Sequence, residues 1–287
     1  MKKYRLKSFC KINLSLRVIK KLKNGYHKIQ SFVTFGDLCD IICISENRGK
    51  KDKIIFYGKF KDYINNESNT ITKVLKLFRK KKLLNKKVFK IKINKNIPHG
   101  AGLGGGSSNA ASLINFFNSQ FNLNLNKDQI YKLGNAVGSD VPISLIQKNL
   151  FVNGKENRTL KLKKKYKFNV LIIFPNLLLS TKKIYLKNRT FSLPRSLSYE
   201  TLNNKRALVH FLQNEHNDLQ ETVIKMYPNI GKIIKVIASQ NGCYFSRLTG
   251  SGSACIGLFS SIKNATLAKK IIRKKFPEYW YVISKTI

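Results

Sequence analysis

A glycine-rich stretch, residues 97–111 (IPHGAGLGGGSSNAA), constrains the fold of this 287-residue chain more than any other segment. It follows a predicted strand, 88–93, in which apolar and lysine side chains alternate, and it leads into a predicted helix. One face of that helix is apolar and contains Ala110, Leu113 or Ile114, Phe117 and Phe121. Glycines let the main chain approach a ligand closely, and a helix N-terminus offers unpaired N–H groups and partial positive charge. The stretch therefore predicts a phosphate-binding site.

Three other interpretations of this stretch are less consistent with the sequence. A flexible linker with a serine helix cap seldom leads straight into a helix with an apolar face. Gly100, Gly102 and Gly105 satisfy the dinucleotide fingerprint G-x-G-x-x-G, but residues 94–99 separate them from the strand. An acidic residue about twenty positions beyond the glycines is also missing. A Walker A loop is excluded because neither Gly-Lys-Ser nor Gly-Lys-Thr follows the glycines.

The order of predicted elements favours an α+β fold. The chain begins with strands and hairpins, including a hairpin turn at Lys23–Gly25 and a strand from about residue 26 to 35. Later elements are predicted as helices near 126–136, 140–147, 205–212, 217–225, 227–239 and 262–275, and as strands at 169–174, 243–247, 253–259 and 280–286.

The glycine-rich stretch resembles the phosphate loop of the GHMP kinases, the superfamily of galacto-, homoserine, mevalonate and phosphomevalonate kinases. Pro-x-Gly-x-Gly-Leu-Gly, small residues and Ser-Ser carry this resemblance. Further matching segments occur in the family's order and approximate spacing: 9–16 (FCKINLSL), 25–27 (GYH), 138–142 (GSDVP), 217–219 (NDL) and 248–255 (LTGSGSAC). Together they span nearly the whole chain. The spelling GLGGGSSNAA is similar to one branch, whose members phosphorylate a cytidine diphosphate sugar alcohol.

The resemblance implies an ATP-dependent small-molecule kinase with two α+β lobes, mostly antiparallel sheets and helices packed on them. The expected lobes are residues 1–155, with the phosphate loop, and 156–287, and the active site is expected in the cleft between them. ATP, together with Mg²⁺, is the implied cofactor. Gly154-Lys155-Glu156-Asn157 departs from the Gly-x-Gly-Glu of relatives. A homoserine- or mevalonate-type kinase is the alternative within the superfamily.

The residues implied to bind ATP form one run and one outlier: Pro98, His99, Gly100, Ala101, Gly102, Leu103, Gly104, Gly105, Gly106, Ser107, Ser108, Asn109 and Asn69. Asn69 precedes an amphipathic helix and matches the position of the family's adenine contact, although a plain N-cap explains it equally. Thr249-Gly250-Ser251-Gly252 resembles the family's third motif, a loop that faces the phosphates. By itself it would be an ordinary turn.

Two residues are implied to be catalytic. Asp140 matches the base toward the acceptor hydroxyl, whereas its local sequence alone favours a helix N-cap followed by an early proline. Most of the other 13 acidic residues lie in lysine-rich or turn-like surroundings and are predicted as surface charge. Lys11 and Asn13 share the polar face of a predicted strand, which would ordinarily face solvent. The resemblance places Lys11 beside the aspartate, where an ammonium would favour the ionised carboxylate.

Five residues are implied to bind the acceptor substrate: Asn13, Tyr26, His27, Thr181 and Tyr185. The family implies that Tyr26 stacks on the cytosine ring, that His27 bonds its edge and that Tyr185 completes a sandwich. Without the family, Tyr26 and His27 are a packed tyrosine and an exposed histidine beside a hairpin turn. Thr181 matches the approximate position of a contact with the sugar alcohol.

A formal net charge of +41 and a pI of about 10.2 would usually suggest nucleic-acid binding. The lysines are spread along the chain without interleaved aromatic residues, so biased genome composition is the preferred explanation, and no specific nucleic-acid partner is expected. The excess charge would still attract anionic substrates. Five cysteines without a C-x-x-C pair indicate reduced thiols and a cytoplasmic location. Neither a signal peptide nor a membrane-spanning run is predicted.

Overall fold

The structure is a computed structural model that describes residues 2–287 except 48, 63, 66, 86, 154–157, 163–165, 199–200 and 202. The departure from the family pattern at Gly154–Asn157 therefore lies outside the described residues. The chain forms two compact units. Unit 1 comprises residues 1–11, 38–99 and 104–147, and unit 2 comprises residues 12–37, 100–103 and 148–287.

The two units are interleaved along the chain, because residues 12–37 belong with the segment from 148 onward. Strands β1 (Lys3–Asn13) and β3 (His27–Glu46) each contribute residues to both units. The expected division into consecutive lobes, 1–155 and 156–287, thus does not coincide with these compact units. As a division into family lobes it stays a prediction.

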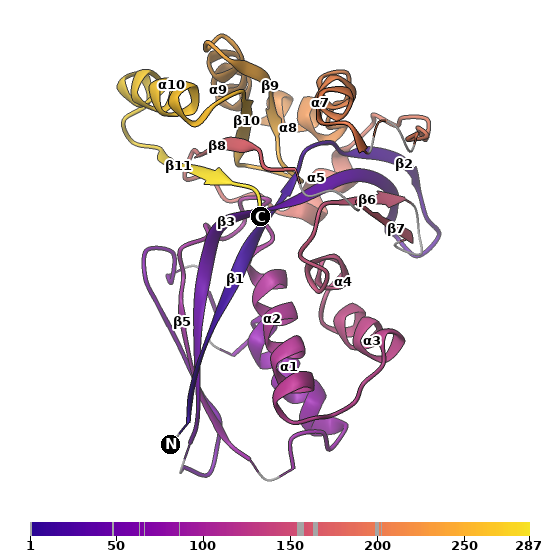
Figure 1. Cartoon of the computed structure of the whole chain (residues 1–287), viewed down its shortest axis with the longest axis vertical. Coiled ribbons are helices and arrows are strands. Elements are labelled where there is room, and N and C mark those ends of the chain that lie inside the picture. Colours follow the sequence, from indigo (N-terminus) through magenta and orange to yellow (C-terminus); the bar gives the residue numbers. More distant parts are fainter. Residues whose placement is uncertain are drawn as a thin grey trace. The chain divides into compact units, whose positions relative to one another are not determined.

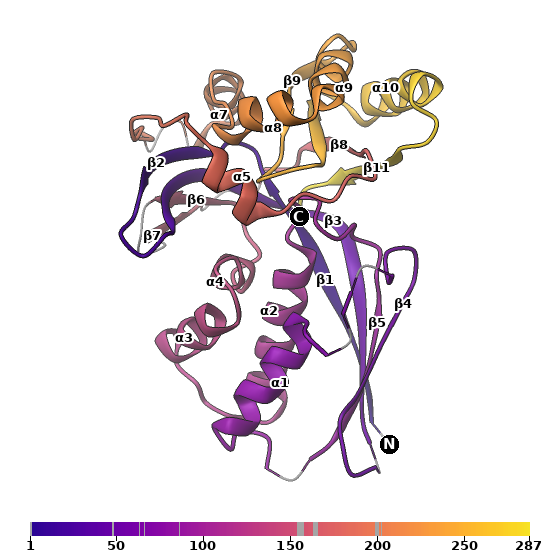
Figure 2. The ribbon, with the colours of Figure 1, turned by 180° about the vertical axis from the view of Figure 1, so that it is seen from behind.

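Unit 1 is a small sheet with helices packed against it. The second half of β3 pairs antiparallel with β5 (Phe89–Asn94), from Ile41 opposite Asn94 to Glu46 opposite Phe89, and β4 (Lys53–Tyr57) pairs parallel with β5. Helices α1 (Thr70–Lys80) and α2 (Gly105–Gln120) lie together on one side of these strands (Figures 1 and 2). Helices α3 (Lys127–Val137) and α4 (Val141–Ser144) follow, so the predicted helix 140–147 is shorter than expected.

Aromatic side chains in the core of unit 1 pack against the apolar face predicted for α2. The ring of Phe117 lies 5.4 Å from that of Phe78 on α1 and 5.2 Å from that of Phe89 on β5. Aromatic rings at such distances contribute packing beyond the area that they bury. This packing fixes α2 against both neighbours and so positions its N-terminus.

Unit 2 contains two sets of strands. In the first, β2 (Arg17–Lys21) forms a hairpin with the first half of β3, with Lys21 opposite His27, and β6 (Leu150–Asn153) pairs with β3 and with β7 (Arg158–Lys161). Gly25 adopts a φ of +81° in the hairpin turn, which confirms the predicted turn. The second set is an antiparallel sheet of order β11-β8-β10-β9: Trp280–Lys285, Asn169–Phe174, Cys255–Phe259 and Cys243–Leu248.

Helices cover this four-stranded sheet. Helices α9 (Pro228–Ala238) and α10 (Ile262–Lys275) pack on its strands (Figure 1), and Ile233, Ile237 and Ile272 are buried there. Among the described residues, unit 2 also contains helices α5 (Thr181–Lys187), α7 (Lys205–Gln213) and α8 (Leu219–Met226). Antiparallel sheets with helices packed on them confirm the predicted α+β class.

Burial corrects two expectations from the sequence. The polar face of the first strand is not solvated, because Lys11 is 5% and Asn13 4% exposed. Surface charge was expected for most acidic residues, but Asp40, Glu215 and Asp218 are buried. A buried charge needs an ion pair or hydrogen bonds, so each of these residues must have partners.

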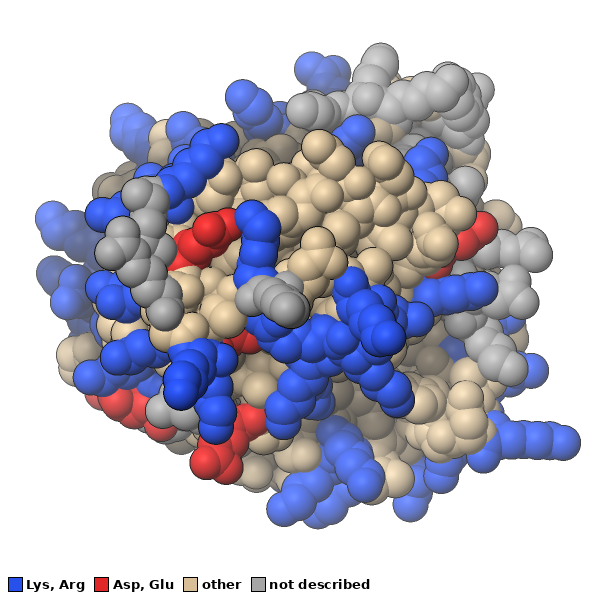
Figure 3. All heavy atoms as spheres, turned by 90° about the horizontal axis from the view of Figure 1, so that it is seen from below, with Lys and Arg blue, Asp and Glu red and all other residues tan. Residues whose placement is uncertain are grey.

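The surface agrees with the composition. Lysine and arginine side chains are spread over the face in Figure 3, with few acidic groups between them. All five cysteines are free thiols. Within the described part of the chain, none of the helices has the length and apolar character needed to cross a membrane.

Candidate active site

Lys11 and Asp140 form an ion pair in unit 1. Lys11 Nζ, from β1, lies 3.0 Å from Asp140 Oδ2, and the two side chains are 6% and 43% exposed. Asp140 occupies the N-cap position of α4, yet among the described residues its side chain makes no capping hydrogen bond. The local expectation of an N-cap is therefore correct for its position but not for its bonding. The carboxylate faces an ammonium and stays accessible.

The phosphate loop reaches the same lysine. Gly104, the N-cap residue of α2, has a φ of +64°, and a Cβ added there would lie 2.9 Å from Lys11 Cβ. A side chain at Gly104 would therefore be strained and would collide with the lysine stem. Gly104 has no side chain that could cap α2, and uncapped N–H groups at a helix N-terminus are suited to binding an anion.

Two hydroxyl groups connect α1 to α2 and α4 to Asp140. Thr70 Oγ1 donates to the carbonyl of Gly106 at 2.7 Å, and Ser144 Oγ donates to the carbonyl of Asp140 at 3.0 Å.

Two asparagines implied to bind ATP differ in their bonding. Asn69 accepts the Thr72 N–H at 2.9 Å and is therefore the N-cap of α1, one of the two roles that the sequence allowed besides an adenine contact. Asn109 is buried, and its side-chain oxygen has no partner among the described residues.

The remaining loop residues, 100–103, lie in unit 2 beside the third family motif. Ala254 N–H donates to the Ala101 carbonyl at 3.1 Å. Gly102 has a φ of +75°, and a Cβ there would lie only 2.2 Å from the Thr249 carbonyl oxygen. Asn13 N–H donates to Thr249 Oγ1 at 2.9 Å. Asn13, the middle of the phosphate loop and the third motif are thus brought together.

Asn217 supports this arrangement by hydrogen bonds to the main chain of the third motif. Its Nδ2 donates to the carbonyls of Leu248 and Gly250, each at 2.8 Å. No role was predicted for Asn217 from the sequence, although its occurrence in a matching family segment was the available signal. Thr181 Oγ1 lies 2.8 Å from Ser251 Oγ, so the predicted contact with the sugar alcohol is beside the same turn.

The predicted base-binding residues are only partly brought together. The rings of His27 and Tyr185 lie 5.0 Å apart and are inclined at 36°. Tyr185 follows Thr181 by one helical turn on α5, while Tyr26 is 63% exposed. Partial burial, then the positive charge of Lys21, lower the pKa of His27 below its usual value near 6.5. Its imidazole is therefore neutral near pH 7 and can both donate and accept hydrogen bonds.

The two residues at the start of the phosphate loop differ in exposure. Pro98 is buried and His99 is exposed. Partial desolvation, followed by the charge of Lys95, lowers the pKa of His99 below its usual value. The ring of His99 therefore adds no positive charge at neutral pH.

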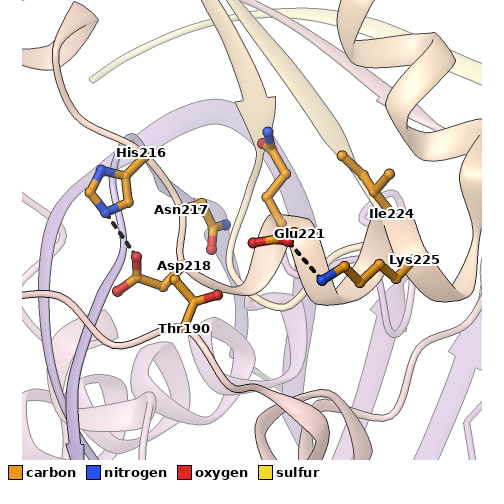
Figure 4. A pocket seen from close by; sticks show the side chains of 8 residues that line it. Thr190, His216, Asn217, Asp218, Glu221, Ile224 and Lys225 are labelled. Carbon is orange, nitrogen blue, oxygen red and sulfur yellow. Dashed lines mark ion pairs between the residues drawn. The ribbon is translucent and has the colours of Figure 1, made fainter.

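A separate cavity of about 490 Å³ lies beside α8 in unit 2 (Figure 4). Its wall contains His216, whose Nε2 lies 2.8 Å from Asp218 Oδ1 and 2.9 Å from Ser192 Oγ. Both contacts use the same ring nitrogen, so the group lacks the geometry of a serine hydrolase, which uses one nitrogen for each partner. Burial would raise the pKa of Asp218, but hydrogen bonds from His216, Val18 N–H and Ser192 lower it overall. This group is structural, because it holds residue 192 beside β2.

Family models match both ends of the fold. Residues 69–148 match the GHMP kinases N terminal domain, and residues 200–278 match the GHMP kinases C terminal domain. The crystal structure of a mevalonate kinase superimposes with a TM-score of 0.70 at 17% identity and covers 99% of both chains. Fold and site thus define a small-molecule kinase of the GHMP class.

Relatives over the full length narrow this class. The chain is 39% identical to the 4-diphosphocytidyl-2-C-methyl-D-erythritol kinase of Pelagibacter ubique over 100% of both chains. It is 34% identical to the enzyme of that name from Wolbachia pipientis, over 96% of this chain and 97% of the relative. A crystal structure of 4-(cytidine 5'-diphospho)-2C-methyl-D-erythritol kinase has the same fold, with a TM-score of 0.79 at 22% identity over 99% of both chains. The chain belongs to the 4-diphosphocytidyl-2-C-methyl-D-erythritol kinase family.

Proposed function

We propose that this chain transfers the γ-phosphoryl group of ATP to the 2-hydroxyl of 4-diphosphocytidyl-2-C-methyl-D-erythritol. This reaction belongs to the methylerythritol phosphate route to isoprenoid precursors. Similarity to relatives of that name along the whole chain supports the substrate. The observation that carries the chemistry is the Lys11–Asp140 ion pair beside the uncapped start of α2.

The N-terminus of α2 supplies the phosphate site. Its free N–H groups and the helix dipole attract the triphosphate, and Gly104 brings the main chain against the Lys11 stem. Phosphoryl transfer requires mostly positioning and electrostatic stabilisation. A rigid helix held by aromatic packing meets that requirement.

Asp140 and Lys11 divide the proton and charge chemistry. Asp140 accepts the proton of the acceptor hydroxyl while the oxygen of that hydroxyl attacks the γ-phosphorus of ATP. The Lys11 ammonium stabilises the negative charge that develops on that oxygen. Because the Lys11 side chain is only 6% exposed, water screens its charge weakly.

The acceptor is held by groups on unit 2. Tyr26, His27 and Tyr185 bind the cytosine by stacking and edge hydrogen bonds, and Asn13 and Thr181 bind the remainder of the molecule. Covalent continuity links these groups to the catalytic pair, because Asn13 follows Lys11 by two residues on the same strand.

A Mg²⁺ ion bound together with ATP would supply neutralisation of the phosphate charge. In nucleotide sites it takes one or two protein oxygens besides phosphate oxygens and water. The half-buried Ser107 hydroxyl, in the first turn of α2, and the accessible Asp140 carboxylate are oxygen donors of the type that it prefers. The described residues contain no cluster of three or more His, Cys, Asp or Glu that could hold a metal ion.

An ADP-release assay tests this function. The purified chain should release ADP when given Mg²⁺-ATP and 4-diphosphocytidyl-2-C-methyl-D-erythritol, and the product should carry one added phosphate on its 2-hydroxyl. Homoserine and mevalonate serve as competing acceptors. Efficient turnover of either one, with none of the cytidine compound, would contradict the proposed substrate and favour a different GHMP kinase.

A further inference from the structure

Asp40 is a fully buried carboxylate on β3 in unit 1. It lies beside the residues that connect the end of β5 to the phosphate loop. The β3–β5 ladder ends with Ile41 opposite Asn94. Immediately beyond it, Asp40 Oδ1 accepts the main-chain N–H groups of Asn96 and Ile97 at 2.8 and 2.9 Å. Its Oδ2 is paired with Lys95 Nζ. Where the main chain turns away from the sheet, hydrogen bonds to the Asp40 side chain thus take the place of the hydrogen bonds between β3 and β5.

The residues that Asp40 holds also form the base of the phosphate loop. A Cβ added to Gly105, the first residue of α2, would lie 3.0 Å from Ile97 Cγ2 and 3.5 Å from Lys95 Nζ. Ile97 and Gly105 therefore touch across the base of the segment 98–104. Whatever fixes Lys95 and Ile97 also fixes where that segment begins and ends.

The arrangement is costly unless it is complete. Lys95 is 3% exposed and lies beside a helix N-terminus, which is itself partly positive. A buried ammonium in that position needs a close carboxylate. Asp40 provides it and orders two main-chain groups at the same time.

Asp52 offers a matched comparison at the other end of β5. It accepts two hydrogen bonds from Arg79, at 2.8 and 2.9 Å, and one from the Phe89 N–H at 2.8 Å. It is thus also a carboxylate that joins a cation to the main chain of β5. The difference is location, because Phe89 is at the end of β5 away from the phosphate loop.

We propose that Asp40 and Lys95 are positioning residues that set the geometry of the ATP phosphate loop. The inference rests on the proposed function, since it assigns ATP to this loop. Neither residue is required to touch ATP. They act through Asn96 and Ile97, which hold the loop base against Gly105, so that the N–H groups of α2 meet the triphosphate without reorganisation.

The test compares Asp40→Asn with Asp52→Asn, using ATP affinity from calorimetry, KM for each substrate, and Tm. Both variants are expected to lose stability. Only Asp40→Asn should weaken ATP binding, by about tenfold or more, because small misplacements of binding groups have large effects. The KM for the cytidine substrate should change little in either. Equal ATP affinity in the two variants, whether normal or reduced, would overturn the proposal.

Hydrogen exchange on the unmodified protein provides evidence that does not depend on a variant folding. The amides of Asn96 and Ile97 should be protected without ATP to the same degree as those within β5. Rapid exchange of these two amides that slows only when ATP is added would overturn the proposal that Asp40 and Lys95 position the loop. If the unmodified protein shows no ATP binding, the proposed function itself fails, and the inference fails with it.

Discussion

The proposed phosphate-binding region of unit 1 and the proposed base-binding region of unit 2 are built differently. Around the phosphate loop, Lys11 and Lys95 are almost completely buried and each is paired with an aspartate. In the proposed base-binding region Tyr26 is 63% exposed, and the rings of His27 and Tyr185 are in contact. Buried ion pairs fix geometry before substrate arrives, whereas exposed rings adapt to a ligand. Changes in the first region should therefore reduce the rate of transfer or the binding of ATP, and changes in the second should mainly weaken acceptor binding.

A large contrast is expected from Lys11→Met. Loss of the buried ammonium removes the charge next to the reacting oxygen, and kcat should fall by about 10²- to 10³-fold. Lys87→Met is the control, because Lys87 pairs with Glu46 on the surface, where both side chains are about half exposed. Steady-state kinetics check the pair. A comparable kcat for both variants would remove Lys11 from the chemistry.

A smaller effect is expected from Gly104→Ala. Both Gly104 and Gly25 have positive φ, +64° and +81°, so alanine is strained at either position. That strain costs about 1–2 kcal/mol. Within the described chain, a Cβ at Gly25 meets nothing within 4 Å, whereas one at Gly104 meets Lys11. Thermal unfolding should show loss of stability in both, while the KM for ATP should rise only in Gly104→Ala. An unchanged KM there would show that the loop tolerates displacement.

The base-binding region is tested by Tyr185→Ala. Stacking on a base contributes about 1–3 kcal/mol, so the KM for the cytidine substrate should rise about tenfold with a much smaller change in kcat. Leu186→Ala, a change at the adjacent and 51% exposed position, is the control. If kcat falls in Tyr185→Ala as much as in Lys11→Met, the contrast between the two regions is wrong.

The smallest effect concerns pH. The pKa of His99 is lowered in the folded protein, so as pH falls below about 6.5 the unfolded chain takes up a proton first. The stability associated with the neutral ring is therefore complete above that pH and is lost below it. Tm measured from pH 8 to pH 5 should fall less steeply in His99→Gln than in the unmodified protein. Identical slopes would show that His99 titrates as in the unfolded chain.

Strong local patterns predicted much of the fold. The strand Asn169–Phe174 is a continuous apolar run, and helix Ile262–Lys275 has clear periodicity, so both were located correctly. Strand β3 was predicted to end near residue 35 but continues to Glu46. Asp37 and Asp40 interrupt its pattern, and only tertiary structure reveals that Asp40 is buried against Lys95.

The residues of the candidate site were easier to predict from the sequence than their burial and their ion pairs. Family motifs identified Lys11 and Asp140, and the structure pairs them, while their catalytic roles stay predictions. Alternation along the first strand suggested a solvated lysine, because local sequence cannot show that both faces of β1 are covered there. Asp40 was missed because its partner, Lys95, lies 55 residues away in the sequence.

The most direct test is the rate of a single turnover in Asp140→Asn with ATP already bound, measured by rapid quench. Loss of a general base should reduce phosphoryl transfer by about 10²- to 10⁴-fold while ATP affinity is retained. Asp128→Asn, at an exposed acid in the first turn of α3, should react like the unmodified protein. Transfer by Asp140→Asn at the rate of Asp128→Asn would contradict the account.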